Sequence, residues 1–250
     1  MKFENKVVVI TGGVRDIGKA ISLKLAKEGA KLAINYHSNE EQGKETLNEV
    51  LALGGEAILV QGDMTKSADV ENFIQKTTEA FGEKIDVLVN VAGGLVARKT
   101  IGEMDEDFFN LVIGLNLNTT FLLTKACVPH MTEGCSIVNL SSQAARDGGG
   151  PGASAYAAAK GAVTTFTRGM AKELGPKGIR VNALCPGMIA TLFHDNFTAD
   201  EARKNVANAT AMKREGHANE VADTVAYLAS DESSFLNGVN LDINGGLAFS

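Results

Sequence analysis

The sequence predicts an α/β fold with a doubly wound, seven-stranded parallel sheet and helices on both faces. Short apolar runs rich in β-branched residues alternate with longer segments whose apolar residues recur at helical spacing. This alternation requires crossover connections, which place helices on both faces of a parallel sheet. Because no long linker rich in proline or serine divides the 250 residues, we expect residues 1–250 to form one domain.

Strands are expected where a short apolar run is bounded by glycine or polar residues. Val7–Ile10 is a continuous β-branched run, which is typical of a strand buried on both faces. The other six strands are expected at Leu32–Tyr36, Ala57–Val60, Ile85–Asn90, Ser136–Leu140, Ile179–Leu184 and Val239–Ile243.

Helices are expected between the strands. Ile17–Glu28 carries apolar residues at helical spacing, and Gly29 follows where glycine commonly ends a helix. The segment from Gly187 to Arg214 has no regular pattern, and we expect it to form a mobile flap over the substrate. Further helices are expected at Glu40–Leu53, Ala68–Phe81, Glu106–Met131, Ala155–Leu174 and Asn219–Ser230.

The composition argues against several classes of protein. A net charge of −6 leaves no basic stripe for a nucleic acid. Cys127, Cys135 and Cys185 form no CxxC pair, which disfavours a disulfide framework and a thiolate zinc site. His194 beside Asp195 has no further ligand pattern, so we expect no metal. Without a signal peptide or an apolar stretch of about 20 residues, we expect a cytoplasmic protein that binds no membrane.

Glycine and polar residues follow several of the strands. The turn Thr11–Gly18 comes between the first strand and a helix, where glycines let the backbone approach a pyrophosphate. Asn90–Gly93 and Ser142 follow the fourth and fifth strands, and Tyr156 and Lys160 share one face of a helix. Each feature alone also fits an ordinary turn or a solvated helix face. Together they indicate one site, because ligands bind beyond the carboxyl ends of parallel strands.

This combination resembles the short-chain dehydrogenase/reductase family over essentially the whole chain, in the style of 3-oxoacyl-carrier-protein reductases and sugar dehydrogenases. The resemblance implies a Rossmann fold and hydride transfer between a nicotinamide and a carbonyl or alcohol. It also implies a catalytic set of Asn116, Ser142, Tyr156 and Lys160, in which Asn116 holds a water of a proton relay and Lys160 contacts the nicotinamide ribose.

The resemblance further implies a cofactor site along one edge of the sheet. Pro186–Thr191 corresponds to the segment that meets the nicotinamide carboxamide, and Gly245–Gly246 to a pair of glycines near the C-terminus. The cofactor-binding residues are then expected to be Gly12, Arg15, Asp16, Ile17, Gly18, Tyr36, His37, Ser38, Asp63, Met64, Asn90, Ala92, Gly93, Tyr156, Lys160, Pro186, Gly187, Ile189 and Thr191.

Two positions depart from the family pattern. Val91 replaces an asparagine, which leaves Asn90, Ala92 and Gly93 in place. Asp16 replaces the middle glycine of the turn and brings a carboxylate toward the expected phosphate. Since aspartate commonly caps helix starts, we favour the interpretation that Asp16 points outward and caps its own helix. The alternative is a nucleotide-binding regulator that has kept the fold and lost catalysis.

The residue types account for the chemistry that the resemblance implies. A free tyrosine has a pKa of about 10 and is a poor proton carrier near neutral pH. We expect the ammonium of Lys160 to favour the tyrosinate and so to lower the pKa of Tyr156. Ser142 would hydrogen-bond the substrate oxygen and hold it near Tyr156.

The end of the second strand predicts the choice of cofactor. NAD-dependent enzymes usually carry Asp or Glu there, whereas this chain has no carboxylate before Glu40. Arg15, His37 and Ser38 together suit the 2′-phosphate of NADP(H). We therefore favour NADP(H), with NAD(H) as the alternative.

The loops that border the substrate are expected to contribute Gly94, Gln143, Arg146 and His194. This polar, partly cationic set favours a small oxo sugar acid, such as a 4-deoxy-hexoseulose uronate derived from an unsaturated uronate. Its carboxylate would pair with Arg146, because guanidinium and carboxylate match in a fork geometry. The alternative substrate, favoured by the resemblance alone, is a 3-oxoacyl thioester on acyl-carrier protein.

A homotetramer is also expected. The helices Glu106–Met131 and Ala155–Leu174 are rich in apolar or small residues, which allow another helix to approach closely. The resemblance implies that these two helices are buried between subunits in two-fold pairs.

Overall fold

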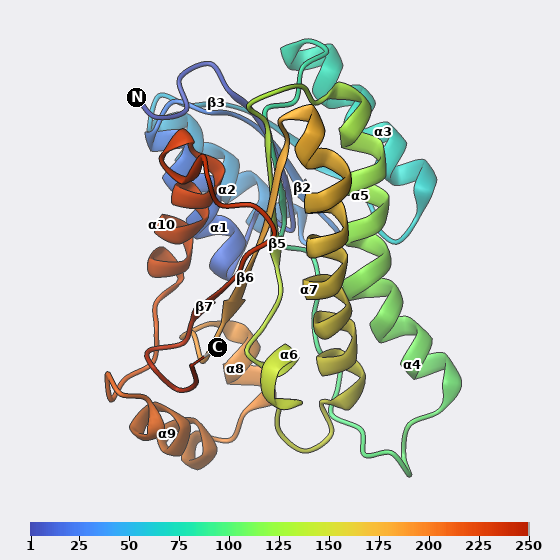
Figure 1. The fold of residues 1–250 in the computed structure, drawn as a ribbon, viewed down its shortest axis with the longest axis vertical. Helices are drawn as coiled ribbons and strands as arrows, with labels where there is room; N and C mark the ends of the chain where they lie inside the picture. Colours follow the sequence, from blue (N-terminus) through green and yellow to red (C-terminus); the bar gives the residue numbers. More distant parts are fainter. Residues whose placement is uncertain (250) are drawn as a thin grey trace.

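The computed structural model describes residues 1–249, and its centre is a parallel sheet with the strand order β3-β2-β1-β4-β5-β6-β7 (Figure 1). All neighbouring strands pair in parallel; in the β1–β4 pair, for example, Thr11 lies opposite Asn90. The strands are β1 Val7–Thr11, β2 Lys31–Tyr36, β3 Glu56–Gln61, β4 Val87–Asn90, β5 Ser136–Leu140, β6 Arg180–Pro186 and β7 Asn240–Ile243.

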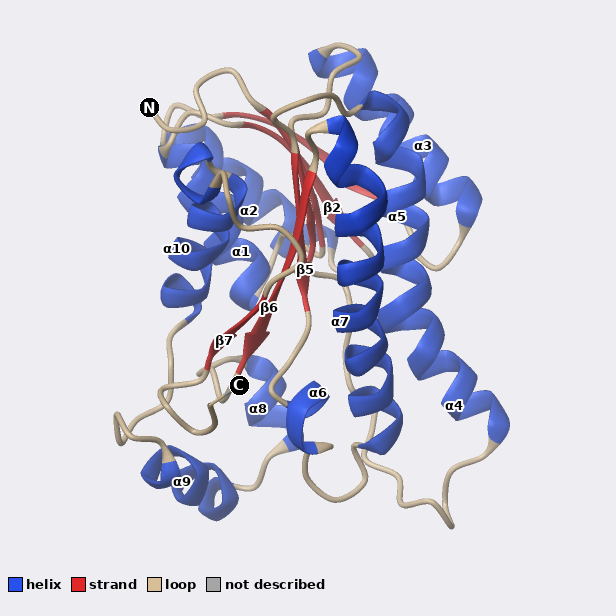
Figure 2. Cartoon of the chain, in the orientation of Figure 1, coloured by secondary structure: helices blue, strands red, loops and turns tan. Residues whose placement is uncertain are grey.

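Helices cover both faces of this sheet (Figure 2). One layer contains α1 Asp16–Lys27, α2 Glu40–Ala52 and α10 Ala218–Ala229, and the other contains α3 Ser67–Phe81, α5 Thr119–Cys127 and α7 Ser154–Leu174. Val8 and Ile10 of β1 pack into the core of the first layer, whereas Val9 packs into that of the second. Successive side chains of a strand point to opposite faces, so a strand between two layers must be apolar throughout. The predicted fold class is confirmed.

The long helix predicted over Glu106–Met131 is interrupted. Its first part, α4 Glu106–Ile113, begins at Asp105, whose carboxylate accepts a hydrogen bond of 2.7 Å from the amide of Phe108. A π-helical segment, Gly114–Asn118, separates α4 from α5, and a short 3₁₀ turn, Val128–His130, follows α5. Such π segments are frequent at functional sites, and this one contains Asn116.

By length and composition alone, the helical segment Glu106–His130 could cross a membrane, because its most apolar window of 18 residues has a mean hydropathy of 1.4. The sequence analysis recognised no such stretch. About two fifths of its most apolar window (39%) is buried in this fold. A core helix of a soluble protein has the same properties, and here Leu123 and Cys127 pack into the sheet-facing core.

The segment expected to be irregular, residues 187–214, is largely helical. It contains α8 Leu192–Phe197 and α9 Asp200–Ala209, and Arg203 of α9 pairs with Asp195 and Glu215. The prediction was wrong because both helices are short and bury no residue completely, so they leave no apolar stripe in the sequence. The one-turn helix α6 Ala144–Asp147 was missed for the same reason. The mobility of this segment stays a prediction.

Candidate active site

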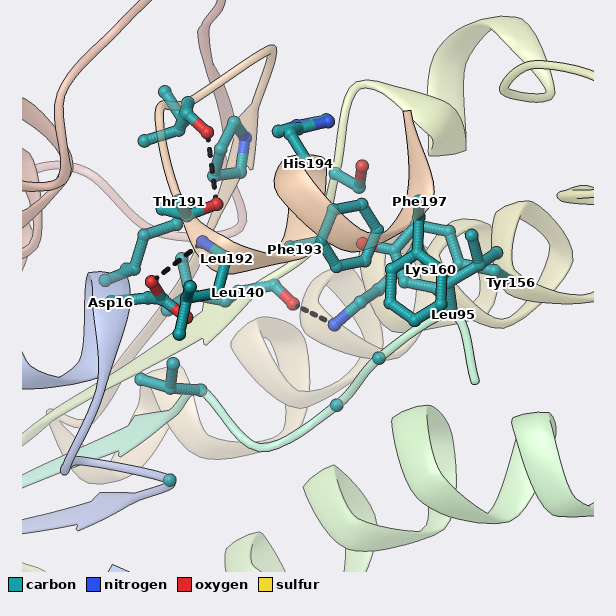
Figure 3. A pocket seen from close by; sticks show the side chains of 18 of the residues that line it. Asp16, Leu95, Leu140, Tyr156, Lys160, Thr191, Leu192, Phe193, His194 and Phe197 are labelled. Carbon is teal, nitrogen blue, oxygen red and sulfur yellow. Dashed lines mark hydrogen bonds between the residues drawn. The ribbon is translucent and has the colours of Figure 1, made fainter. Parts of the chain in front are cut away.

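A cavity of about 1360 Å³ lies beyond the carboxyl ends of the strands. The glycine-rich turn and the loops after β2, β4, β5 and β6 form its walls, together with α8 and part of α9. Figure 3 shows how side chains from these distant segments converge there. The topology thus places the candidate site where an open parallel sheet binds its ligands.

The glycine-rich turn is too tightly packed to admit a side chain at Gly18. A Cβ on Gly18 would lie 2.1 Å from the carbonyl oxygen of Gly12, so only glycine fits there. The amide of Gly12 also donates to the side chain of Asn35 on β2, at 3.3 Å, which fixes the turn against the sheet. The backbone of the turn borders the cavity at the start of α1, an arrangement that fits the pyrophosphate of a dinucleotide.

Asp16 occupies the glycine position of this turn in a backbone conformation that favours glycine. Its φ is +49°, a region that aspartate tolerates better than most residues. The side chain does not cap α1, so the capping interpretation is wrong. Instead, its Oδ1 accepts a hydrogen bond of 3.1 Å from the amide of Leu192, the first residue of α8 (Figure 3). Asp16 therefore links the cofactor turn to the predicted flap across the mouth of the cavity.

Tyr156 and Lys160 lie one turn apart on α7. The Nζ of Lys160 lies 5.8 Å from the centroid of the Tyr156 ring and donates a hydrogen bond of 2.7 Å to the carbonyl of Leu140 (Figure 3). Lys160 is only 4% exposed, and its burial lowers the pKa of the ammonium to about 8.

The pKa of Tyr156 is shifted in the direction opposite to the one expected. Burial raises the pKa of the phenol, and a hydrogen bond with Ser142 lowers it only in part. The positive charge of Lys160, whose ammonium donates to the carbonyl of Leu140, does not reverse this shift. Tyr156 is therefore a protonated phenol near neutral pH, a state suited to donating a proton.

Asn116, the fourth predicted catalytic residue, is buried and does not line the cavity. Its Oδ1 accepts from the amide of Gly94 at 3.0 Å, and its Nδ2 donates to the carbonyls of Gly94 and Val112 at 2.8 and 2.9 Å. A Cβ on Gly93 would lie 2.6 Å from the Oδ1 of Asn116 and 3.1 Å from the Nζ of Lys160. A side chain at position 93 would therefore displace the amide of Asn116. The role of Asn116 in a proton relay stays a prediction.

The structure brings nearly all predicted cofactor residues to the wall of one cavity. Asn90 is the exception: its side chain is buried and donates to Asn139 on β5 at 2.9 Å. The residues that do line the cavity are Gly12, Arg15, Asp16, Ile17, Gly18, Tyr36, His37, Ser38, Asp63, Met64, Ala92, Gly93, Tyr156, Lys160, Pro186, Gly187, Ile189 and Thr191.

At one end of the cavity Arg15, His37 and Ser38 are exposed on neighbouring loops. Glu40, the first carboxylate after β2, forms an ion pair of 2.6 Å with Lys44 and does not line the cavity. This end therefore presents a base and a hydroxyl where an NAD-dependent enzyme usually has an acid.

Asp63 also lines this part of the cavity. Burial raises the pKa of its carboxyl group, but hydrogen bonds from the hydroxyl and amide of Thr65 outweigh the burial and lower the pKa overall. Asp63 is therefore ionised near neutral pH.

Three of the four predicted substrate residues, Gly94, Gln143 and His194, line the cavity, whereas Arg146 does not. The guanidinium of Arg146 donates to the carboxylate of Asp242 at 3.1 Å and to the carbonyl of Asn240 at 2.7 Å. The structure thus contradicts the expectation that Arg146 pairs with a substrate carboxylate, because β7 satisfies its charge.

The aromatic part of the cavity was not predicted from the sequence. The ring of Phe193 lies 5.9 Å from that of Tyr156, and the ring of Phe197 lies 5.3 Å from that of Phe193, measured between centroids. The two phenylalanines are four residues apart, just after Thr191, and this helical spacing was the one sequence feature that could have indicated them. A single such pair is too short a pattern to predict a helix.

Within residues 1–249 no group of three or more His, Cys, Asp or Glu side chains is placed to hold a metal ion. Cys127, Cys135 and Cys185 are free thiols in the core, and burial raises the pKa of Cys127 and of Cys185. The expectation that the protein needs no metal stays a prediction.

Comparison with known proteins identifies the family. A family model described as Enoyl-(Acyl carrier protein) reductase matches residues 12–248. An uncharacterized oxidoreductase of Thermotoga maritima is 38% identical over 253 residues, which cover 98% of each chain. A short chain dehydrogenase of Burkholderia cenocepacia, solved in complex with NADP, is 34% identical with a TM-score of 0.92 and 99% of each chain covered. An NADH-dependent reductase, A1-R′, responsible for alginate metabolism, is 30% identical with a TM-score of 0.90 and 99% of each chain covered.

These matches extend over the sheet, the glycine-rich turn and the Tyr156–Lys160 pair alike. They agree with the resemblance that the motifs indicated and with the observed strand order. The chain belongs to the short-chain dehydrogenase/reductase family and is an NAD(P)-dependent oxidoreductase.

Proposed function

We propose that this protein is an NADP(H)-dependent carbonyl reductase, which also runs in reverse as an alcohol dehydrogenase, with Tyr156 as its proton donor. The observation that carries the proposal is the convergence of Ser142, Tyr156 and Lys160 on the cavity that the glycine-rich turn also borders. A protein that only bound a nucleotide would need the turn but not these three side chains at the same cavity.

The chain's own residues divide the work between binding and proton transfer. The bound nicotinamide supplies the hydride. Ser142 and Tyr156 hold the carbonyl oxygen, and the phenol of Tyr156 gives it a proton as negative charge develops there. Lys160 carries a positive charge beside Tyr156 below a pH of about 8, which favours the tyrosinate left after proton transfer.

The preference for NADP(H) rests on the residues around the 2′ position. Arg15, His37 and Ser38 are exposed at the cavity wall, and Glu40 is paired elsewhere. The Burkholderia relative contains NADP, whereas the alginate-metabolism relative is named as NADH-dependent, so related chains use either cofactor. Titration with NADPH and NADH in parallel tests the preference; equal dissociation constants would contradict it.

The two candidate substrates differ in their support. The oxo sugar acid is supported by the relative that is responsible for alginate metabolism. However, Arg146, the expected partner of its carboxylate, is bound to Asp242 and Asn240 of β7. The 3-oxoacyl thioester has indirect support, because the matching family model is described as Enoyl-(Acyl carrier protein) reductase, which also acts on a thioester of acyl-carrier protein but reduces its carbon–carbon double bond. Both belong in a substrate panel scored by loss of NADPH absorbance.

A homotetramer in the cytoplasm completes the proposal. On α4 and α5 the side chains of Phe109, Leu111 and Phe121 are exposed, and they suit a surface buried between subunits. On α7 a Cβ at Gly161 or Gly169 would meet nothing within 4 Å, so the helix surface is open to close approach. Light scattering that gave the mass of a single chain would contradict this assembly.

The rival proposal is a nucleotide-binding regulator without catalysis. It gains support from Asp16, which departs from the family's glycine. The two proposals separate when NADPH binding and NADPH consumption are measured on the same sample with a panel of ketones and aldehydes. Binding without consumption of NADPH by any carbonyl compound would favour the regulator.

A further inference from the structure

The substrate side of the cavity is built around an aromatic cluster. Phe193 and Phe197 come from α8, and Phe193 faces Tyr156 with the two ring planes inclined by 40°. The rings of Phe193 and Phe197 meet edge to face, with an interplanar angle of 63°. Both phenylalanines are half-buried and line the cavity, as does the buried Leu95 (Figure 3). Apolar groups therefore stand beside the proposed proton donor.

The cations that border the cavity either donate hydrogen bonds within the protein or lie in its cofactor part. Lys160 donates to Leu140, and Arg15 lies at the cofactor turn. Arg98, at the rim, donates to the carbonyls of Phe197 and Pro151 at 2.7 and 2.9 Å. Lys160 and Arg98 thus direct hydrogen bonds to backbone carbonyls of the protein itself.

His194 adds no positive charge at neutral pH. Its Nδ1 lies 3.0 Å from the hydroxyl of Thr198. Burial lowers the pKa of the imidazole, and the neighbouring Arg203 lowers it further, although Glu215 acts in the opposite direction. The ring of His194 lies 5.1 Å from that of Phe193, so the imidazole extends the aromatic cluster.

We infer that the substrate is an uncharged ketone or aldehyde whose carbonyl carries an aryl or branched alkyl group, and that Phe193 and Phe197 bind this group. The inference rests on the proposed reductase function. With the apolar group against these rings, the carbonyl oxygen lies toward Tyr156 and Ser142. Burial of an apolar group against aromatic rings provides binding energy that a hydrated sugar acid cannot obtain there.

The test begins with binding, so that it does not depend on turnover. The inert complex of Tyr156→Phe with NADPH is titrated with acetophenone and with an oxo uronate by calorimetry. We expect acetophenone to bind at least tenfold more tightly than the uronate. Replacing Phe193 or Phe197 with alanine in the same background is expected to weaken acetophenone binding about tenfold, as loss of an aromatic contact and its buried area implies.

Phe235→Ala is the matched control, because Phe235 is fully exposed and does not line the cavity. It is expected to leave ketone binding unchanged. Tighter binding of the uronate, or equal losses in Phe235→Ala and Phe193→Ala, would overturn the inference.

Turnover distinguishes this inference from the proposed function. In an otherwise wild-type enzyme, Phe193→Ala is expected to raise the KM for acetophenone about tenfold and to change the KM for dihydroxyacetone less than twofold. Reduction of the uronate but not of acetophenone would overturn the substrate class and leave the reductase function standing. Ketone binding without reduction of any carbonyl would overturn the reductase function and leave only the aromatic binding site standing.

Discussion

The two halves of the cavity are built in different ways. The cofactor half consists of turns that leave β1, β2 and β4 directly and are fixed to the sheet; for example, the hydroxyl of Thr11 accepts from the amides of Val91 and Ala92 at 3.0 Å. The substrate half depends on α8 and α9, which bury no residue completely and are joined by the ion pair between Asp195 and Arg203. We propose that the sheet fixes where the cofactor binds, whereas separate surface helices determine what the enzyme reduces.

Tyr156→Phe gives the largest expected effect, because it removes the proton donor and keeps the ring. Removal of a general acid costs roughly 10²–10⁴ in rate, and we expect a loss of about 10³ in kcat for ketone reduction. Steady-state kinetics with NADPH check this. The matched control is Tyr227→Phe on α10, whose ring does not line the cavity. Equal activity of the two variants would refute the assignment.

Lys160→Met is expected to stabilise the fold while it impairs turnover. The pKa of buried Lys160 is about 8 in the folded protein, against an ordinary value of 10.5. Keeping the amine charged in the fold therefore costs roughly 3 kcal/mol below pH 8. The variant also loses the hydrogen bond to Leu140, which costs about 1 kcal/mol. The expected net increase in the free energy of unfolding is therefore about 2 kcal/mol at pH 7.

The sign of the pH dependence follows from the lowered pKa of Lys160. Between pH 8 and 10.5 the unfolded chain holds more protons than the folded one, so wild-type stability rises with pH over that window. Urea unfolding at pH 7 and above pH 10 checks this. The advantage of Lys160→Met is expected to shrink at the higher pH. An advantage that did not change with pH would show that burial of the charge is not its cause.

Arg15→Ala tests the cofactor half of the cavity. Only NADPH offers a 2′-phosphate, and a hydrogen bond to a charged group contributes about 1.5–3 kcal/mol, so we expect NADPH to bind at least tenfold more weakly. The affinity for NADH is expected to change less than threefold. Lys19→Ala removes a nearby cation of α1 that pairs with Glu49 and is the control for long-range charge. Equal weakening of both cofactors would assign Arg15 a purely structural role.

Asp16→Gly tests the link between the cofactor turn and α8, and its expected effect is the smallest. Loss of the hydrogen bond to Leu192 releases the start of α8, and a bond of about 1 kcal/mol predicts a rise of roughly fivefold in the KM for the ketone. Asp16→Asn keeps an oxygen acceptor and tolerates the same backbone conformation, so its KM is expected to stay near that of the wild type. If both substitutions raised the KM equally, the charge and not the hydrogen bond would be responsible.

The sequence predicted the cofactor half of the cavity better than the substrate half. Gly12 and Gly18, or Tyr156 and Lys160, lie within one motif, so their spacing in the sequence fixes their spacing in space. Arg146 was misplaced because its partner, Asp242, lies 96 residues away on β7. The contact of Asp16 with Leu192 joins residues 176 positions apart, and no local pattern announces it.

The short helix α8 explains the remaining error. Its six residues leave no helical period to detect, yet they place Phe193 and Phe197 beside Tyr156. The polarity of the substrate side was therefore inferred from Gln143, Arg146 and His194. Of these, Arg146 pairs with Asp242, and burial lowers the pKa of His194 so that its ring is uncharged near neutral pH. Tertiary contacts decided which side chains reached the cavity.

A single-turnover experiment tests most directly whether cofactor binding and proton transfer reside in separate parts of one site. Wild type and Tyr156→Phe are each loaded with one equivalent of NADPH and mixed with excess acetophenone, while bound NADPH is followed by its fluorescence. We predict that both proteins bind NADPH with the same affinity within about twofold, and that only the wild type consumes it at a measurable rate, since loss of a general acid costs roughly 10²–10⁴ in rate. A variant that consumed NADPH as fast as the wild type, or that no longer bound it, would contradict this division.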